Sequence, residues 1–291
     1  MKADIVMIGH ISQDIIVDYL GNRQELIGGA VVYSSFSAAA SGAKVTVVTK
    51  LAKEDDHLIS DIQNPSITWK VIDSKNSTAI RNTYFTADKE RREVVLLSQA
   101  EPFVINEIDV EGEIYHLAGL FGGEIPDTFI KPLSERGKVA MDAQGVLRCL
   151  DDKTELVFLD WENKKELLPY LTYFKVDAAE GKILTGLDDR EAAAKQLVAW
   201  GAKEVMLTHN SEVMIATKDG IYTAPYTNEN NSGRTGRGDT TFAAYMAWRK
   251  EHDIQSSVNF CAALCSIKME SPGPFTGKLE EVLKRVEKDS K

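Results

Sequence analysis

Apolar and polar residues alternate along the chain in blocks that predict strands and helices in turn. The runs DIVMIG (4–9) and AKVTVVTKLA (43–52) are short, apolar and rich in β-branched residues, as in buried strands. Between them, GGAVVYSSFSAAASGA (28–43) opens on two glycines and continues in small residues, which is typical of a closely packed helix. The first fifty residues therefore predict a strand, a helix and a second strand.

The same alternation resumes after residue 112. We predict four strands and a hairpin, at 113–120, 138–145, 172–177, 204–210 and 212–226. We predict helices at 126–137, 178–186, 188–203, 239–250 and 254–269. Strands that alternate with helices indicate an α/β fold with a mostly parallel sheet and helices on both faces.

Residues 67–98 have a different pattern. ITWKVID, STAIRNTYFTAD and REVVLLSQ carry many Thr, Tyr and Val residues, and ADKERR (87–92) is a polar turn. This composition favours an antiparallel, hairpin-rich insert over a strand–helix–strand unit.

Composition narrows the class of partner. The 291 residues carry a formal net charge of −10, which argues against an extended nucleic-acid surface. Neither a membrane span nor a signal-peptide pattern is present, so we expect a cytoplasmic protein with no membrane partner. The three cysteines do not suggest a disulfide framework; Cys261 and Cys265 share a helix face as small hydrophobic residues.

The segment SGRTGRGDTTFAAYM (232–246) holds the main candidate chemistry. Gly236 and Gly238 allow the backbone to approach a ligand closely, and the start of a helix leaves several N–H groups for an anion. Asp239 at that point can take a proton from a hydroxyl beside the anion, which is the pairing needed for phosphoryl transfer. Alternatively, Asp239 is only an acidic residue in a first helical turn.

TGRGDTTFAAY resembles the C-terminal signature of the PfkB (ribokinase-like) family of carbohydrate and nucleoside kinases. Thr235, Gly236, Gly238, Asp239 and Phe242 match its core, whereas Gly233 and Arg237 replace a usual Asp and a small Ala. The resemblance implies that Asp239 is the catalytic base and that the amides from Gly236 through Arg237 and Gly238 to Asp239 form the anion hole. Arg237 adds a cation that faces either phosphate or solvent.

Earlier motifs resemble the part of the family that binds the acceptor. IGHISQD supplies Gly9 and Asp14, and the next motif opens on Gly28 and Gly29. By resemblance, Asp14 accepts hydrogen bonds from substrate hydroxyls, which suits a polyol; otherwise it caps a turn. Tyr33 stands where the family often has a sugar-binding Asn, which counts against a plain ribokinase.

Three further segments complete the resemblance. In FKVDAAEGKILTG, Glu180 fits a Glu tied to magnesium through water, or else it is a solvated residue at a helix start. In VMLTHNSEVMI, Thr208 matches a nucleotide contact, although Asn210 and Val213 replace usual glycines. In AMDAQGVLR, Gln144 and Arg148 follow a strand end where α/β sheets place ligands; a surface ion pair is the alternative for Arg148.

The resemblance spans nearly the whole chain. It implies one kinase domain over 1–291, a ribokinase-like three-layer α/β/α sandwich with a small β-sheet lid. The lid is expected mainly from about 67–98, with short segments near 11–20. On it, Arg81 and Tyr84 either contact substrate or lie at the surface. Such lids often mediate dimerisation, so we expect a homodimer through the lid.

The implied activity is ATP- and Mg²⁺-dependent phosphorylation of a hydroxyl on a sugar, an inositol or a nucleoside. The helix at 254–269 is expected to form one wall of the adenine pocket. One alternative is a catalytically silent sugar- or nucleotide-binding regulator of the same fold. A nicotinamide-dependent oxidoreductase is disfavoured, because GHISQD lacks the GxGxxG expected after the first strand.

Overall fold

A large twisted sheet forms the middle layer of the molecule. The computed structural model describes residues 2–86, 92–151 and 156–290. Within them, nine strands pair in the order β15-β14-β13-β12-β9-β8-β1-β4-β5, and every neighbouring pair is parallel except the two that involve β14. The strands are β1 (Ala3–Ile8), β4 (Val45–Leu51), β5 (Ile67–Asp73), β8 (Gly112–Leu117), β9 (Lys138–Asp142), β12 (Leu171–Asp177), β13 (Glu204–Thr208), β14 (Glu212–Thr217) and β15 (Gly220–Pro225).

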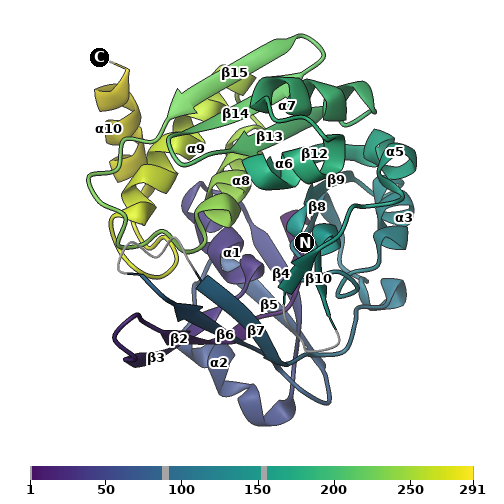
Figure 1. Ribbon diagram of the computed structural model, residues 1–291, viewed down its shortest axis with the longest axis vertical. Helices are drawn as coiled ribbons and strands as arrows, with labels where there is room; N and C mark the ends of the chain where they lie inside the picture. The colour runs from purple at the N-terminus through teal and green to yellow at the C-terminus, as the bar shows by residue number, and fades with distance from the viewer. Residues whose placement is uncertain (1, 87–91, 152–155, 291) are drawn as a thin grey trace.

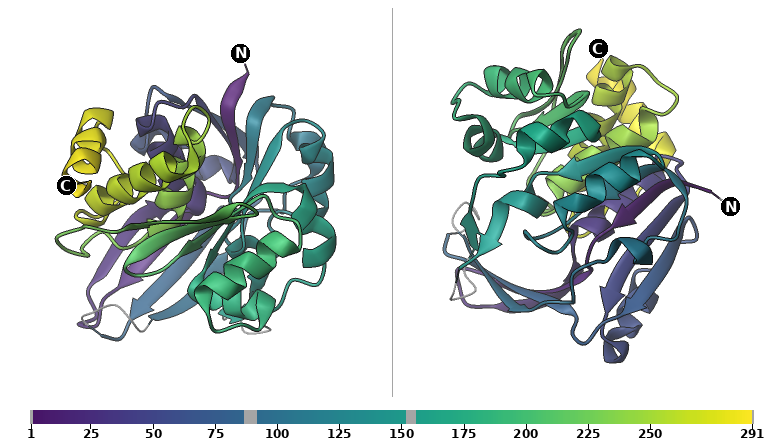
Figure 2. Two further views of the ribbon diagram at one scale, coloured as in Figure 1. Left: turned by 90° about the horizontal axis from the view of Figure 1, so that it is seen from above. Right: turned by 90° about the vertical axis from the view of Figure 1, so that its right-hand side faces the viewer.

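Helices cover both faces of this sheet, as the left panel of Figure 2 shows. One face carries α1 (Ala30–Ala40), α8 (Arg237–Trp248), α9 (Ile254–Met269) and α10 (Leu279–Asp289), with the short α2 (His57–Asp61) near its edge. The other carries α3 (Ile130–Ser134), α4 (Gln144–Leu147), α5 (Lys164–Leu167), α6 (Ala178–Thr185) and α7 (Arg190–Ala199). Each face has its own apolar core, so the expected three-layer α/β/α arrangement is confirmed.

A second, smaller sheet lies along the lower edge of the molecule in Figure 1. It contains β2 (Ser12–Val17), β3 (Arg23–Gly28), β6 (Thr78–Tyr84) and β7 (Arg92–Ser98), in the order β3-β2-β6-β7. Burial alternates along β6: Ile80, Asn82 and Tyr84 face inward, whereas Arg81 lies on the outer face near Glu93. A two-stranded ribbon of β10 (Arg148–Leu150) and β11 (Leu156–Phe158) contacts β7.

The connections explain where a cleft forms. From β1, the sheet continues through β4 on one side and β8 on the other, so the strand order reverses at β1. Open α/β sheets bind ligands at such a reversal, beyond the carboxyl ends of the strands. The small sheet faces that edge in Figure 1. Residues of both sheets, of the start of α1 and of the turn before α8 line a cleft of about 350 Å³.

The structure corrects the expected composition of the small sheet. Residues 67–73 form β5, a parallel edge strand of the central sheet, because each of them pairs with β4. Residues 23–28, which we had not assigned to a strand, form β3 and pair antiparallel with β2. The polar turn expected at 87–92 falls almost wholly outside the described residues.

Other differences are local. The helix expected at 126–137 is a 3₁₀ turn (Asp127–Phe129) followed by the short α3, and a third helix, α10, follows the two expected at the C-terminus. The helix that contains Asp239 begins two residues earlier than expected, at Arg237. Among the described helices, none has the length and apolarity needed to cross a lipid bilayer.

Candidate active site

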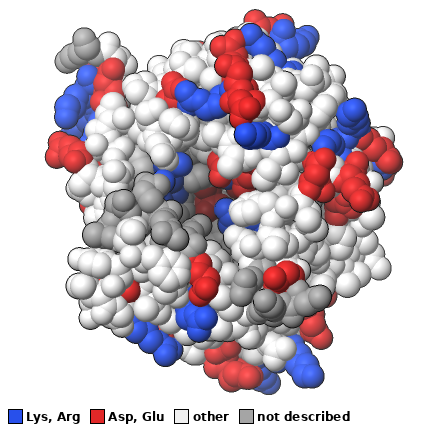
Figure 3. All heavy atoms as spheres, in the orientation of Figure 1, with Lys and Arg blue, Asp and Glu red and all other residues white. Residues whose placement is uncertain are grey.

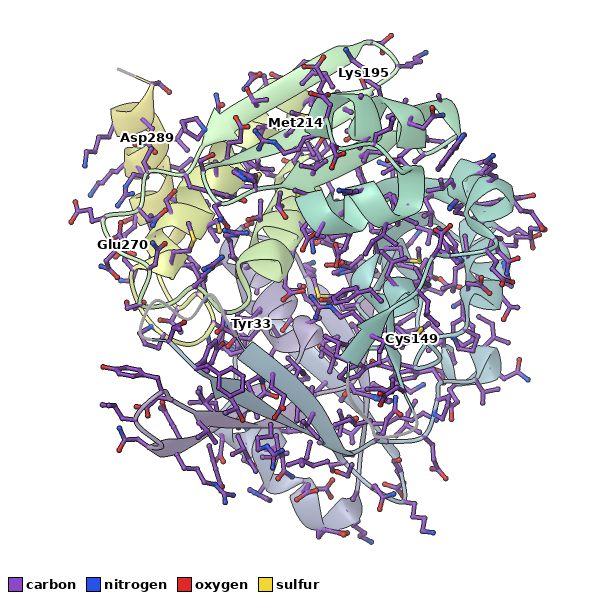
Figure 4. The ribbon with its side chains drawn as sticks, in the orientation of Figure 1. Tyr33, Cys149, Lys195, Met214, Glu270 and Asp289 are labelled. Atoms are coloured by element: carbon purple, nitrogen blue, oxygen red, sulfur yellow. The ribbon has the colours of Figure 1, made fainter. Side chains whose placement is uncertain are left out.

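The glycine-rich turn before α8 places Asp239 at the cleft. Gly236 precedes the helix with φ +77°, a left-handed conformation that favours glycine. A Cβ on Gly236 would also lie 2.2 Å from Cδ1 of Tyr33, so the aromatic ring fills the space beside it. Figure 4 shows Tyr33 between the start of α8 and the small sheet. Both the dihedral and the close packing require glycine at this position.

Helix α1 packs against α8 and bonds to its first turn. Its small residues let the two helices pack closely, and two of its serines bond to the first turn of α8. Ser34 Oγ donates to the Asp239 carbonyl at 3.4 Å, and Ser37 Oγ donates to the Thr240 carbonyl at 2.7 Å. The small-residue helix at 28–43 therefore holds the backbone that carries Asp239.

The turn offers backbone donors to an anion. Within the described chain, the N–H groups of Gly236, Gly238 and Asp239 make no backbone hydrogen bond. All three residues line the cleft at a helix N-terminus, where the helix dipole favours negative charge. This part of the site can hold a phosphate.

A buried charge network lies beneath the turn. Lys175, from β12, has its Nζ 2.9 Å from Asp142 Oδ2 and 3.8 Å from Glu180 Oε2. Although burial opposes its charge, the carboxylates of Asp142 and Glu180 raise the pKa of Lys175 above its usual range. A Cβ on Gly238 would lie 3.0 Å from Lys175 Nζ, so the ammonium lies directly against the turn.

Asp239 has an environment suited to a general base. Burial raises its pKa to about 6, and the nearby Asp142 carboxylate adds to the rise, while Lys175, Arg148 and Lys268 lower it. At neutral pH the carboxylate is ionised, yet it binds a proton more readily than an exposed aspartate does. A base with a pKa just below the working pH is effective in proton transfer.

The opposite wall belongs to the small sheet and the start of α1. Ser12 Oγ donates to Asp14 Oδ1 at 2.7 Å, which orients the carboxylate at the cleft. Gly28 packs beneath Asp14, because a Cβ there would lie 2.3 Å from Asp14 Oδ2. Gly29, with φ +102°, begins α1 against the backbone of His10. The two glycines thus shape the floor around Asp14.

Two arginines converge at the far end of the cleft. Arg237 donates to Asn210 Oδ1 at 3.0 Å and Arg234 donates to the same oxygen at 3.2 Å. The Arg237 guanidinium also lies 5.8 Å from the centre of the Tyr226 ring. Arg237 is therefore held at the cleft by side chains of neighbouring loops, and Asn210 is the residue that replaces a usual glycine.

Most residues expected at the site from the sequence line this one cleft, namely Asp14, Gly29, Tyr33, Gln144, Arg148, Thr208, Thr235, Gly236, Arg237, Gly238 and Asp239. Gly28 and Glu180 lie just behind its surface. Figure 3 shows basic and acidic side chains together in the central hollow. Tyr84 lines the cleft, whereas Arg81 lies on the other face of β6.

Sequence reasoning missed Lys175, Lys268 and Asn82. A lysine in the apolar strand TYFKVD is the signal that could have identified Lys175, because buried lysines need a partner. Asn82 lines the cleft through the alternation of β6, which becomes visible once the pairing of β6 with β2 is known.

Glu180 tests whether the residues fit a magnesium ion. It is buried, burial raises its pKa to about 7, and it forms a reciprocal capping box with Asp177 at the start of α6. Its Oε1 has no hydrogen-bond partner among the described residues and lies 4.0 Å from Arg148. The described residues include no group of three or more His, Cys, Asp or Glu side chains around one point. This fits a magnesium ion held mainly by phosphate and water, with Glu180 acting through water.

The fold and the arrangement of the cleft are those expected of a phosphotransferase, and comparison with known proteins identifies the family. The chain matches the model of the pfkB family of carbohydrate kinases over residues 2–281. A pyrophosphate-dependent kinase in the ribokinase family, solved with a pyrophosphate analogue and myo-inositol, is 34% identical with a TM-score of 0.88, covering 96% of this chain and 99% of that one.

Two more distant relatives differ in acceptor. The curated cytidine kinase of Thermococcus kodakarensis is 25% identical over 264 residues, which are 84% of this chain and 87% of that protein. Arabidopsis thaliana ribokinase, solved with ribose and ATP, has the same fold at 17% identity and a TM-score of 0.75, over 98% and 99% of the two chains. The chain belongs to the pfkB family, has the ribokinase fold and is a kinase.

Proposed function

We propose that the protein transfers a phosphoryl group from pyrophosphate to a hydroxyl of a small cyclic polyol of the inositol class. The observation that carries the choice of donor is the polar, cationic wall around Arg234 and Arg237. Among the described lining residues none comes from α9, the helix expected to flank an adenine. A volume of about 350 Å³ is near the lower end of small-molecule sites, about 300–1,000 Å³, and suits a compact donor.

The packing behind Arg234 supports a donor without a base. The segment before α8 is fastened to the end of α9: Gly233 N donates to the Met269 carbonyl and Ser232 Oγ to the Glu270 carbonyl, both at 2.8 Å. A Cβ on Gly233 would lie 1.8 Å from the Ser271 carbonyl oxygen, so little space remains between this segment and α9. Charged phosphates need cations and N–H groups, which this wall supplies.

In the proposed reaction, Asp14 orients the acceptor by accepting hydrogen bonds from its hydroxyl groups, and Asp239 accepts the proton of the reacting hydroxyl. The hydroxyl oxygen forms a bond to the terminal phosphorus while the bridging P–O bond breaks and the second phosphate leaves. The N–H groups of Gly236, Gly238 and Asp239 stabilise the transferring phosphoryl oxygens. Lys175, beneath the turn, and Arg148, beside Glu180, supply positive charge near the transferring phosphoryl group.

Magnesium, where bound, would offset phosphate charge and orient the donor. Glu180 would hold it through water, since its buried Oε1 makes no hydrogen bond to the described groups. Its neighbours Lys175 and Arg148 keep Glu180 from carrying an isolated buried charge.

The second candidate is an ATP-dependent nucleoside kinase. It is supported by the cytidine kinase relative and by the sequence expectation of ATP, with Thr208 and Thr235 near the nucleotide. The two candidates share Asp239 and its amides, so they differ in donor and acceptor but not in chemistry. The cationic wall and the filled space beside α9 favour the first.

One substrate matrix tests both. Pyrophosphate and ATP would each be offered with myo-inositol, ribose and cytidine, with product phosphate esters followed by ³¹P NMR and a no-acceptor control for hydrolysis. We expect pyrophosphate with the inositol to give the highest kcat/KM. In Arg237→Ala we expect the KM for pyrophosphate to rise by about tenfold or more, because a charged hydrogen bond is worth about 1.5–3 kcal/mol. A preference for ATP with cytidine would overturn the donor assignment.

The outer face of the small sheet supports a homodimer, and we propose the whole chain as one kinase domain with this sheet as its lid. Leu97 of β7 is 46% exposed there, and Phe85 and Tyr19 lie exposed at the strand ends. Exposed large apolar side chains on and beside one sheet favour an interaction surface there. Analytical ultracentrifugation of the wild type and Leu97→Lys would test it; a monomeric wild type would contradict it.

A further inference from the structure

Lys268 is a buried cation behind the glycine-rich turn, outside the lining of the cleft. It lies near the end of α9 and is 2% exposed. Its ammonium donates to the carbonyl oxygens of Gly233 and Thr235, and its Nζ lies 4.9 Å from the centre of the Tyr33 ring. Among the described residues, the hydrogen-bond acceptors of its ammonium are these two backbone carbonyls. A charge buried this way is costly unless carbonyl dipoles hold it.

The two carbonyl contacts fix the direction of backbone N–H groups. In a planar trans peptide the C=O and the following N–H point in opposite directions. With the Thr235 carbonyl directed to Lys268, the N–H of Gly236 is directed away from it, toward the cleft that Gly236 lines. Lys268 therefore orients the N–H of Gly236 toward the cleft, although Lys268 itself does not line the cleft.

The contact between Lys268 and the Thr235 carbonyl also removes a hydrogen-bond acceptor from the first turn of α8. An uninterrupted α-helix would bond the Asp239 N–H to the Thr235 carbonyl four residues earlier. Here the first such bond of α8 runs from Thr240 N to the Gly236 carbonyl at 2.9 Å, and Lys268 takes the Thr235 carbonyl instead. The Asp239 N–H thus stays available for an anion.

We infer that Lys268 is a positioning residue for phosphoryl transfer, an internal cation that holds the glycine-rich turn in its anion-binding geometry. This inference rests on the anion-binding role proposed above for the amides of Gly236, Gly238 and Asp239. Without the ammonium, two buried carbonyl oxygens would lose their hydrogen-bond donor, and the turn would reorient to satisfy them. The loss would therefore fall on the transfer step more than on acceptor binding.

The first test is Lys268→Ala with chemical rescue. We expect kcat to fall about 100-fold or more, the loss found when one oxyanion donor is removed, with the acceptor KM within about twofold. Ammonium or ethylammonium ions, which fit the space left by the side chain, should restore about tenfold of the loss. Lys50→Ala is the control for the loss of a buried lysine, because Lys50 is 3% exposed and bonds the Pro102 carbonyl and the Glu107 carboxylate but lies outside the cleft lining.

The second test uses pH and stays informative if Lys268→Ala does not fold. Burial lowers the pKa of Lys268 to about 8, so the wild-type kcat should fall as pH rises through 8. The other titratable groups that face it ionise at pH values away from 8. Burial raises the pKa of Cys265 on α9 to about 11 and also raises the pKa of Tyr33 on α1 well above its usual value, whereas the pKa of Asp239 on α8 is about 6. In Lys268→Arg this alkaline fall should disappear, because guanidinium keeps its proton.

Three results would overturn the inference: a folded Lys268→Ala with kcat near that of the wild type, a loss that amines do not restore, or the same alkaline fall in wild type and Lys268→Arg. Asp239→Asn, measured alongside, separates this inference from the proposed function. An active Asp239→Asn would refute the base, whereas an inactive Asp239→Asn with an unaffected Lys268→Ala would refute only the positioning role.

Discussion

Asp239→Asn should make the protein more stable at alkaline pH while it removes activity. Burial raises the pKa of Asp239 from 3.8 to about 6, so the folded protein bears a cost whenever this carboxylate is ionised. At about 1.4 kcal/mol per pH unit, the cost is about 2 to 3 kcal/mol. An asparagine of the same size carries no charge and removes most of that cost.

The sign of the pH dependence follows from proton binding. Between about pH 4 and 6 the folded state holds a proton on Asp239 that the unfolded state has released, so wild-type stability falls as pH rises through this window. The stability gain of Asp239→Asn should therefore be complete above about pH 7 and absent below about pH 4.

Urea denaturation at pH 4.5 and pH 8 measures the effect. We expect the free energy of unfolding of Asp239→Asn to exceed that of the wild type by about 2 kcal/mol at pH 8, and by much less at pH 4.5. Its kcat should fall by about 10²–10⁴, the usual contribution of a general base. If the wild type and Asp239→Asn were equally stable at both pH values, burial would not destabilise the ionised carboxylate, and its pKa would not be raised.

Three further outcomes follow from the geometry. The kcat of the wild type should rise with pH through about 6, and Lys175→Met should move that rise to higher pH, because Lys175 lowers the pKa of Asp239; an unmoved profile would contradict this. Gly236→Ala should reduce kcat/KM far more than Gly238→Ala, since Gly236 has φ +77° and a Cβ there would lie 2.2 Å from the Tyr33 ring, whereas a Cβ on Gly238 would meet only the end of Lys175 at 3.0 Å; equal effects would argue against a fixed turn. In sedimentation, Leu97→Lys should shift a dimer toward monomer, and an unchanged dimer would place the interface elsewhere.

The alternation of apolar blocks predicted the layers of the fold well, because period and length report burial directly. It failed at β5, whose sequence ITWKVID has the Thr and aromatic content of an exposed hairpin. As an edge strand, β5 is covered less than the inner strands, so composition alone cannot separate it from the small sheet. Strand β3 escaped notice because its first residues, Arg23, Gln24 and Glu25, are exposed and polar.

The candidate site was predictable where function demands an unusual residue in the chain, as at Gly236, Gly238 and Asp239. Lys175 and Lys268 were not, because a single lysine in an apolar stretch gives no indication of which distant group it meets. Lys175 meets Asp142, 33 residues away, and Lys268 meets Gly233, 35 residues away. Their roles, like those of the predicted site residues, stay predictions until variants are measured.

The two walls of the cleft come from separate stretches of the chain. Asp14, Tyr33 and Asn82, on the wall proposed to bind the acceptor, belong to the first hundred residues, whereas the carboxylate, amides and cations proposed for the transfer lie between Asp142 and Lys268. Tyr33 couples the two walls, because its ring packs against Gly236 and lies under the Lys268 ammonium. Substitutions farther from the turn, as at Asp14 or Asn82, can change the first wall with less effect on the second, since sites without shared contacts contribute nearly independently to free energy. A protein of this fold can therefore change its acceptor alcohol through substitutions in the N-terminal third, while the residues proposed for phosphoryl transfer stay the same.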